Sequence, residues 1–187
     1  MGVQVREKSV EEIRTKLLSM QTALNKITYL ESALREIGLT YEIKRFIWGE
    51  LGNLYGERIM YEKAAKAMMN KAAMEVSPRT KIDNYISAAE YFSRAGRVDD
   101  ADEMFNRASR DSSPQEKIKI NLAKKNIYLV CATELEKKGK RASAVKFFEK
   151  LMKMNLEEFE KVQIKEKLLS TYKALGHFRE AKLIEGM

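Results

Sequence analysis

The spacing of apolar residues is the feature that most constrains how this chain folds. Apolar side chains recur at intervals of three and four along almost the whole sequence, which places them on one face of a helix. No sustained period-two pattern with hairpin turn residues interrupts this spacing, so β-strands are not expected. Because 44% of the 187 residues are hydrophobic, the chain can bury a core. We therefore predict an all-α folded protein.

Capping residues and glycines divide the sequence into separate helices. Ser9, Ser113 and Asn155 each stand three positions before a glutamate, which is the spacing of an N-terminal capping box, and Ser77-Pro78 is a further start signal. Helix ends are expected near the four glycines at 38, 96, 139 and 176. These signals predict helices at about 10–37, 41–59, 61–76, 78–95, 98–110, 114–138, 141–153, 156–175 and 178–187. The connections are short, so successive helices are expected to run antiparallel.

Three of these glycines begin the same motif. The stretches GRVDDA, GKRASA and GHFREA each place an alanine five residues after the glycine, at Ala101, Ala144 and Ala181. A glycine accepts the left-handed conformation that ends one helix, and a small alanine lets the next helix approach closely. Phe105 and Phe148 follow one turn later on the same face. The motif therefore predicts repeated helical hairpins.

In these glycine, alanine and aromatic positions the chain resembles the tetratricopeptide repeat family. One copy of the family's pattern is matched at Trp48, Leu51, Gly52, Tyr55 and Ala64. The turn glycine of that copy is replaced by Ile59. Three further copies carry the family's small and aromatic positions, at Tyr85, Ala88, Ala89, Phe92, Ala101, Phe105 and Ala108, at Tyr128, Cys131, Ala132, Leu135, Ala144 and Phe148, and at Leu168, Leu169, Tyr172 and Ala181.

The resemblance implies a single helical-repeat domain over residues 1–187, with four hairpins at 41–187 preceded by a long N-terminal helix at 9–38. The expected architecture is a right-handed superhelical array of antiparallel hairpins, or α-solenoid. Members of this family bind partner proteins in a concave groove lined by the first helix of each hairpin. On this chain the resemblance places Asn53, Glu90, Thr133 and Ser170 in the groove and implies a non-catalytic adaptor or scaffold.

One repeat departs from the family's regular length. The pattern alanines at 64, 101, 144 and 181 are 37, 43 and 37 residues apart, against a family period of about 34. From Pro114 to Gly139 is 25 residues, whereas from Pro78 to Gly96 is 18. Seven extra residues add two helical turns, or about 10 Å, and keep the buried stripe in phase. We expect one end of this longer helix to project.

The basic charge is concentrated in the same repeat. The formal net charge is +8, and residues 117–153 alone hold eleven basic and three acidic residues. Two interpretations stay open: a solvated helix surface, or a footprint for the phosphate backbone of structured RNA such as a ribosomal subunit. The candidate RNA patch is Lys117, Lys119, Lys124, Lys125, Lys137, Lys138, Lys140 and Arg141.

Residue types that carry catalysis or hold metals are scarce. His177 is the only histidine and Cys131 the only cysteine, so neither has a second residue of its type with which to share a metal. His177 stands in a predicted turn, and Cys131 at a position expected to be buried. Phosphate-binding glycine loops and zinc-ligand spacings are missing as well. We expect no enzyme activity, cofactor or small-molecule substrate.

Neither a membrane-spanning nor a secretory segment is expected, because no apolar run approaches the required length and the start of the sequence lacks the pattern of a signal peptide. The single cysteine is typical of a reducing compartment. A cytoplasmic location without membrane partners is therefore expected.

Both ends of the chain suggest self-association. In the predicted first helix, residues Ile13, Leu17, Leu24 and Ile37 belong to a near-heptad apolar seam that either zips against a second copy or packs on the helix of Trp48. Leu183, Ile184 and Met187 have no following helix to cover them. A homodimer is expected, with Ile13, Leu17, Leu24, Leu183, Ile184 and Met187 as candidate contacts.

Overall fold

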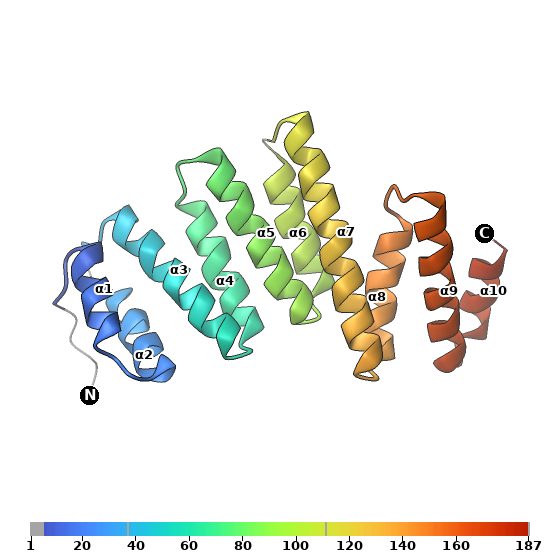
Figure 1. Ribbon diagram of the computed structural model, residues 1–187, viewed down its shortest axis with the longest axis horizontal. Helices are drawn as coiled ribbons and strands as arrows, with labels where there is room; N and C mark the ends of the chain where they lie inside the picture. The colour runs from blue at the N-terminus through green and yellow to red at the C-terminus, as the bar shows by residue number, and fades with distance from the viewer. Residues whose placement is uncertain (1–5, 37, 111, 187) are drawn as a thin grey trace. The chain divides into compact units, whose positions relative to one another are not determined.

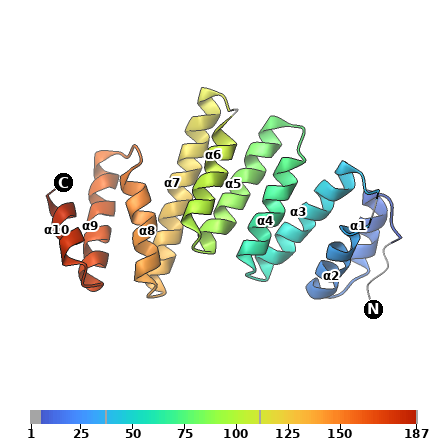
Figure 2. The ribbon, with the colours of Figure 1, turned by 180° about the vertical axis from the view of Figure 1, so that it is seen from behind.

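A computed structural model describes residues 6–36, 38–110 and 112–186, and every regular element in that part of the chain is an α-helix. Figures 1 and 2 show these helices from two sides. The all-α prediction is confirmed. In chain order the helices are α1 (Val10–Leu18), α2 (Ala23–Ala33), α3 (Tyr41–Glu57), α4 (Tyr61–Ala73), α5 (Pro78–Arg94), α6 (Val98–Arg110), α7 (Pro114–Lys137), α8 (Arg141–Met152), α9 (Glu158–Ala174) and α10 (Phe178–Glu185).

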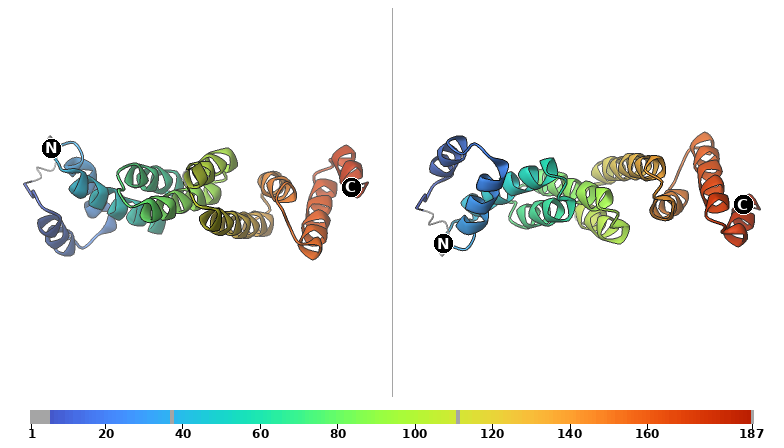
Figure 3. Two further views of the ribbon diagram at one scale, coloured as in Figure 1. Left: turned by 90° about the horizontal axis from the view of Figure 1, so that it is seen from above. Right: turned by 90° about the horizontal axis from the view of Figure 1, so that it is seen from below.

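The chain divides into two compact units. Unit 1 comprises Met1–Ala95 and Asp99–Ser112, and unit 2 comprises Gly96–Val98 and Ser113–Met187. In unit 1, α3 packs against α4 and α4 against α5, while α1 and α2 both pack on α3. In unit 2, α7 packs on α8, α8 on α9 and α9 on α10. Helices α9 and α10 lie side by side in the views from above and below (Figure 3). The two units are described separately below.

The predicted long N-terminal helix is wrong, because α1 and α2 are separate helices. The hydroxyl of Ser19 donates to the carbonyl oxygen of Lys16 at the end of α1. The hydroxyl of Thr22 then accepts from the backbone nitrogen of Asn25 and caps a new helix. The apolar seam therefore belongs to two helices that both pack on α3, and a continuous heptad does not form. Ile37, the last residue of that seam, lies outside the described residues.

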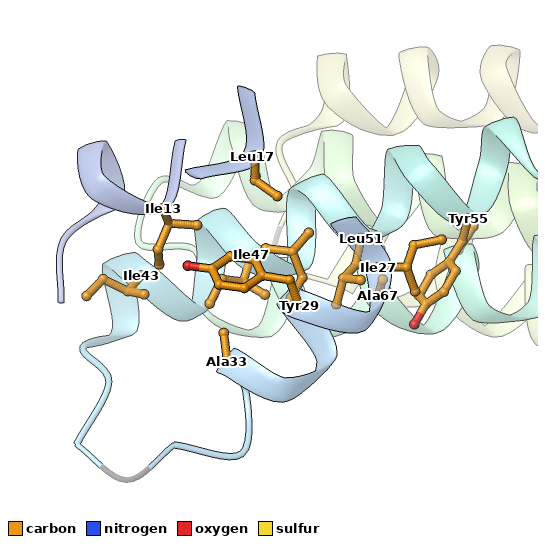
Figure 4. Packing of buried hydrophobic residues seen from close by; sticks show 12 residues of the cluster. Ile13, Leu17, Ile27, Tyr29, Ala33, Ile43, Ile47, Leu51, Tyr55 and Ala67 are labelled. Atoms are coloured by element: carbon orange, nitrogen blue, oxygen red, sulfur yellow. The ribbon is translucent and has the colours of Figure 1, made fainter. Parts of the chain in front are cut away.

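The core of unit 1 forms where α1 and α2 meet α3. Ile13 of α1, Leu30 of α2 and both Ile47 and Leu51 of α3 are fully buried. Figure 4 shows side chains from the three helices pointing toward one another, together with Ala67 of α4. This packing explains why the first two helices form although each is short, since an isolated helix of about ten residues is marginal in water.

The tight turns between helices share one geometry. The residues Ile59, Gly139 and Gly176 have φ values of 60°, 73° and 75°, in the left-handed region. The next residue donates its N–H to a carbonyl oxygen five positions earlier, at 2.8 to 2.9 Å, in Met60 to Tyr55, Lys140 to Leu135 and His177 to Tyr172. This bond satisfies a free carbonyl at the helix end. The predicted stops at Gly96, Gly139 and Gly176 are confirmed, since a helix ends two residues before each and all three have positive φ. Gly38 also has positive φ, but α2 already ends at Ala33.

The pattern alanines are all buried. Ala64, Ala101 and Ala144 are fully buried and Ala181 is 2% exposed. The aromatic residues one turn later, Phe105 and Phe148, are buried as well. In unit 2 the ring of Phe147 meets Tyr128 edge-on at 5.3 Å between centroids. The predicted lengthening is confirmed, because α7 has 24 residues and α5 has 17.

Candidate functional site

Three glycines on one side of α3 allow its neighbours to approach closely. They stand at Gly49, Gly52 and Gly56, spaced by three and four residues. A Cβ at Gly52 would lie 2.7 Å from the terminal methyl group of Met68 on α4. A Cβ at Gly56 would lie 2.5 Å from the hydroxyl oxygen of Tyr91 on α5. These glycines therefore decide where the side chains of α4 and α5 stand beside α3.

Three hollows lie along α3, and Asn53 lines all of them. The first, of about 360 Å³, lies toward α4 and the second, of about 550 Å³, toward α1 and α2. Both are also lined by Phe46 and Glu50. The third, of about 310 Å³, lies toward α5. Together we call them the α3 groove, lined by Val10, Arg14, Leu17, Leu18, Lys26, Glu42, Arg45, Phe46, Gly49, Glu50, Asn53, Leu54, Gly56, Glu57, Tyr61, Met68, Lys71, Glu75, Ser87, Glu90, Tyr91 and Arg94.

Aromatic and charged side chains form the wall of the groove at α5. The rings of Tyr61 and Tyr91 stack with centroids 6.3 Å apart. The guanidinium of Arg94 lies 5.9 Å from the centroid of the Tyr61 ring and donates twice to one carboxylate oxygen of Glu90, from Nε at 3.1 Å and from Nη2 at 2.8 Å. The Glu90 hydrogen bonds raise the pKa of Arg94, and burial, followed by the charge of Glu90, raises the pKa of Tyr91. At neutral pH this wall presents a neutral phenol beside a bonded ion pair.

The opposite end of the groove is held by a second polar cluster. Glu75, at the end of α4, is nearly buried, with its side chain 8% exposed. It accepts from Nδ2 of the buried Asn84 at 3.3 Å and lies 3.6 Å from Nη1 of Arg45. On the α1 side, the guanidinium of Arg14 lies 5.3 Å from the centroid of the Phe46 ring. The groove walls are therefore fixed by contacts between side chains of different helices.

Acidic and basic side chains line the α3 groove in equal number. The acids are Glu42, Glu50, Glu57, Glu75 and Glu90, and the bases are Arg14, Lys26, Arg45, Lys71 and Arg94. Each of the three hollows is lined by both signs, so the groove carries no field of a single sign. A surface of this kind matches a mixed polar and apolar segment better than a polyanion.

The four residues predicted to line a groove fall in both units. Asn53 and Glu90 lie together in the hollow toward α5, as residues of one groove must. Thr133 and Ser170 are on α7 and α9 of unit 2, where their hydroxyls donate to Leu129 O and Lys167 O of their own helices. Within unit 1, Asn53 and Glu90 are thus brought together.

The predicted basic patch is split along α7. Lys117, Lys119, Lys124 and Lys125 are in its first half, and Lys125 bonds to Glu160 at 2.6 Å. The other four, Lys137, Lys138, Lys140 and Arg141, are exposed around the α7–α8 turn. Twelve helical residues separate Lys125 from Lys137, or about 18 Å along the axis. The eight residues therefore form two clusters, and a continuous patch is not present.

The candidate dimer contacts differ in exposure. Ile13 is fully buried and Leu17 is 6% exposed, because both point into the core of unit 1 (Figure 4), so neither is a surface contact. Leu24 is 57% exposed and Leu183 is 71% exposed, while Ile184 is half-buried. Met187 lies outside the described residues.

His177 and Cys131 both stand at structural positions. His177 opens α10 in the turn described above, with its ring 6.1 Å from that of Tyr172. Cys131 is a buried cysteine on α7. Among the residues that the structure describes, no three His, Cys, Asp or Glu side chains gather as a metal site would need. Within the same residues, no helix has the length and apolar character needed to cross a membrane.

Sequence reasoning missed what shapes the groove. The spacing of Gly49 and Gly56 from Gly52 is visible in the sequence and puts all three on one side of α3. It was the signal that could have predicted close helix packing there. Tyr91 and Arg94, which form the wall, carry no motif of their own. Comparison with known proteins gave no match to a family model, a curated protein or a solved structure.

Proposed function

We propose that this protein is a non-catalytic binding module, similar to tetratricopeptide repeat adaptors, that holds a segment of a partner protein in the α3 groove. The observation that carries the proposal is that three hollows meet at one exposed residue, Asn53. A groove lined by two or more helices and containing aromatic rings fits an extended or helical peptide.

The charge pattern favours a protein partner over a nucleic acid. A phosphate backbone needs a surface of positive charge, whereas the α3 groove is lined by equal numbers of acids and bases. Tyr61 and Tyr91 stack on each other, so their facing surfaces are already occupied. Aromatic residues and arginines at the centre of a surface are typical of protein interfaces.

The proposal is tested by affinity capture from native cell extract after nuclease treatment. The bait is the full chain, either wild type or with Asn53→Arg, which places a large cation where the three hollows meet. Wild-type protein is expected to retain specific proteins that the variant loses. The loss is expected because a bulky charge at the centre of a contact surface excludes the partner.

A matched control makes this test specific to the groove. Asn106→Arg makes the same exchange at an exposed helical asparagine of unit 1, on α6. It should retain the same partners as wild type. The proposal fails if Asn53→Arg retains every partner, or if Asn106→Arg loses them to the same degree.

A second candidate function rests on the α7–α8 turn. There Lys137, Lys138, Lys140 and Arg141 are all exposed, and Lys138 lies 3.7 Å from Glu134. We propose that this cluster docks the protein on structured RNA, as a ribosome-associated factor would. Charge reversal at all four positions should abolish nuclease-sensitive, salt-sensitive retention of RNA. Unchanged RNA retention would remove the cluster from consideration.

A further inference from the structure

One side of α7 in unit 2 exposes apolar residues that nothing within the unit covers. Ile118 is 69% exposed, Leu122 and Val130 are each 52% exposed, and Leu129 is 38% exposed. Their spacing places them within about a third of the helix circumference, and we call them the α7 face. They extend over twelve residues, or about 18 Å of the helix axis. This length matches three turns of a partner helix.

The charge that α7 itself contributes around the α7 face is basic. Residues 117–133 contain four lysines and no aspartate or glutamate. Lys117 and Lys119 are exposed beside Ile118, and Nζ of Lys124 lies 5.5 Å from the centroid of the Tyr128 ring. Lys125 is held by Glu160 on α9, and its hydrogen bond lowers the pKa of that carboxyl group. The surroundings of the α7 face are thus basic, unlike the mixed charges of the α3 groove.

A hollow of about 470 Å³ adjoins the α7 face. It shares Ile118 and Leu122 with that face, and its other wall is the connection between α8 and α9. It is lined by Ile118, Asn121, Leu122, Lys124, Lys125, Lys153, Met154 and Asn155. An apolar floor with lysines and two amides around it can hold one apolar side chain and the polar groups beside it.

We infer that the α7 face and its hollow bind an acidic amphipathic helix of a partner protein. An apolar stripe on the partner would cover Ile118, Leu122 and Val130, and its carboxylates would meet the surrounding lysines. RNA fits less well, because bases are held by stacking on aromatic or guanidinium planes and the α7 face carries only aliphatic side chains. The inference concerns unit 2 alone, so this inference and the α3 groove proposal can each fail while the other holds.

The test is a display selection against the full chain. The library holds 18-residue amphipathic helices with a fixed leucine stripe and Glu, Lys or Gln at each polar position. Selection is run in parallel on wild type and on Leu122→Gln with Val130→Gln. These sites are exposed, and far-ultraviolet circular dichroism should show unchanged helix content. Enriched helices should be acidic, and we expect their affinity to fall about tenfold or more on the variant.

A control variant and an RNA probe complete the experiment. Phe159→Gln with Val162→Gln removes two exposed apolar residues of α9, 65% and 46% exposed, and should leave binding unchanged. Enrichment of basic or neutral helices, no enrichment at all, or equal affinity for the α7 variant overturns the inference. If a labelled RNA hairpin binds wild type, loses affinity for the α7 variant, and no peptide is enriched, the inference is overturned in favour of RNA.

Discussion

Among the described residues, Ile59 is the one non-glycine position with a left-handed backbone, at φ 60°. It stands where the other tight turns have glycine, and its N–H donates to the carbonyl oxygen of Gly56 at 3.0 Å. The conformation costs a residue with a Cβ about 1 to 2 kcal/mol, and a β-branched residue is especially unsuited to it. The side chain is 72% exposed, so packing returns little of that cost. The isoleucine that replaces glycine at this turn therefore destabilises unit 1 locally.

The substitution Ile59→Gly is therefore expected to raise the free energy of unfolding by about 1 kcal/mol. This value allows for the greater conformational freedom of glycine in the unfolded chain, which offsets part of the gain. Urea denaturation monitored by circular dichroism measures the change. Val76→Gly, at another exposed β-branched residue without positive φ, should give no gain. A loss of stability in Ile59→Gly would show that the strain at this turn is unimportant.

Two glycines of α3 should respond to alanine in opposite ways. A Cβ at Gly56 would lie 2.8 Å from ring atoms of Tyr91, which is stacked on Tyr61 and cannot yield easily. We expect Gly56→Ala to lower the free energy of unfolding by about 1 kcal/mol, since overpacking outweighs the gain in helix propensity. A Cβ at Gly49 would lie 3.3 Å from Nζ of Lys71, the mobile end of a long side chain.

Gly49→Ala should therefore leave stability unchanged or raise it by up to about 1 kcal/mol. The pair is compared by urea denaturation under one set of conditions. Equal effects of both substitutions would contradict the role assigned to the Gly56 and Tyr91 contact in shaping the groove wall.

At the scale of helices, the sequence located nearly every element but not all of their boundaries. Ser113 accepts from the backbone nitrogen of Glu116 as predicted. The start at Asn155 was displaced to Glu157, whose N–H donates to the carboxylate of Glu160. The break between α1 and α2 was missed, because apolar spacing continues through it and only Thr22 marks the new start. Periodicity reports which residues are buried, whereas a break depends on local hydrogen bonds that leave the period intact.

The same tyrosine–glutamate contact joins consecutive helices in both units, and no sequence motif predicts it. The hydroxyl of Tyr55 on α3 donates to Glu31 of α2 at 2.5 Å, and the hydroxyl of Tyr172 on α9 donates to Glu149 of α8 at 2.5 Å. Each glutamate directly follows a core residue, Leu30 or Phe148. The partners are 24 and 23 residues apart in sequence, so only the folded hairpins bring them together.

These contacts predict a loss of stability at alkaline pH. Burial, and then the hydrogen bond to glutamate, raises the pKa of Tyr55 and of Tyr172 above the ordinary value of about 10. Their stabilising effect is therefore complete below pH 10 and is lost as pH rises toward the folded-state pKa. Above pH 10, the loss of each tyrosine–glutamate contact should lower the free energy of unfolding by up to about 1.4 kcal/mol per pH unit.

The variant Tyr55→Phe tests this directly. It should lower the free energy of unfolding by about 1 kcal/mol at pH 8 and make the decline between pH 8 and pH 11 shallower than in wild type. Tyr41→Phe, at a tyrosine that is 75% exposed, is the control and should change neither quantity. An identical pH dependence in Tyr55→Phe and wild type would contradict the account.

At the scale of the whole molecule, the two proposed binding surfaces differ in charge and belong to different units. The α3 groove of unit 1 is lined by equal numbers of acids and bases, whereas α7 contributes only lysines around the α7 face in unit 2. The sequence located the excess charge at residues 117–153, because counting charges needs no structure. The separation of the two lysine clusters also follows from the sequence, because Lys125 and Lys137 both lie in the predicted helix at 114–138 and each residue adds about 1.5 Å of rise.

Self-association stays a prediction, and exposed residues at both ends of the chain remain candidates for it. Light scattering at micromolar concentration should give twice the chain mass of 21.6 kDa. Leu24→Glu and Leu183→Glu, both at exposed positions, then show which helix forms the dimer contact. The variant that places a charge in that contact should break the dimer and give the mass of a monomer. A monomer mass for wild type contradicts the homodimer.

Photo-cross-linking from two sites in unit 1 tests the central claim most directly. A photoreactive amino acid replaces Asn53, where the three hollows of the α3 groove meet, or Lys66, an exposed residue on the side of α4 turned away from the groove-lining Met68 and Lys71. After irradiation in native extract and nuclease treatment, position 53 should yield defined protein adducts and position 66 none of them. Equal adducts from both sites, or adducts from position 66 alone, would contradict a binding site in the α3 groove.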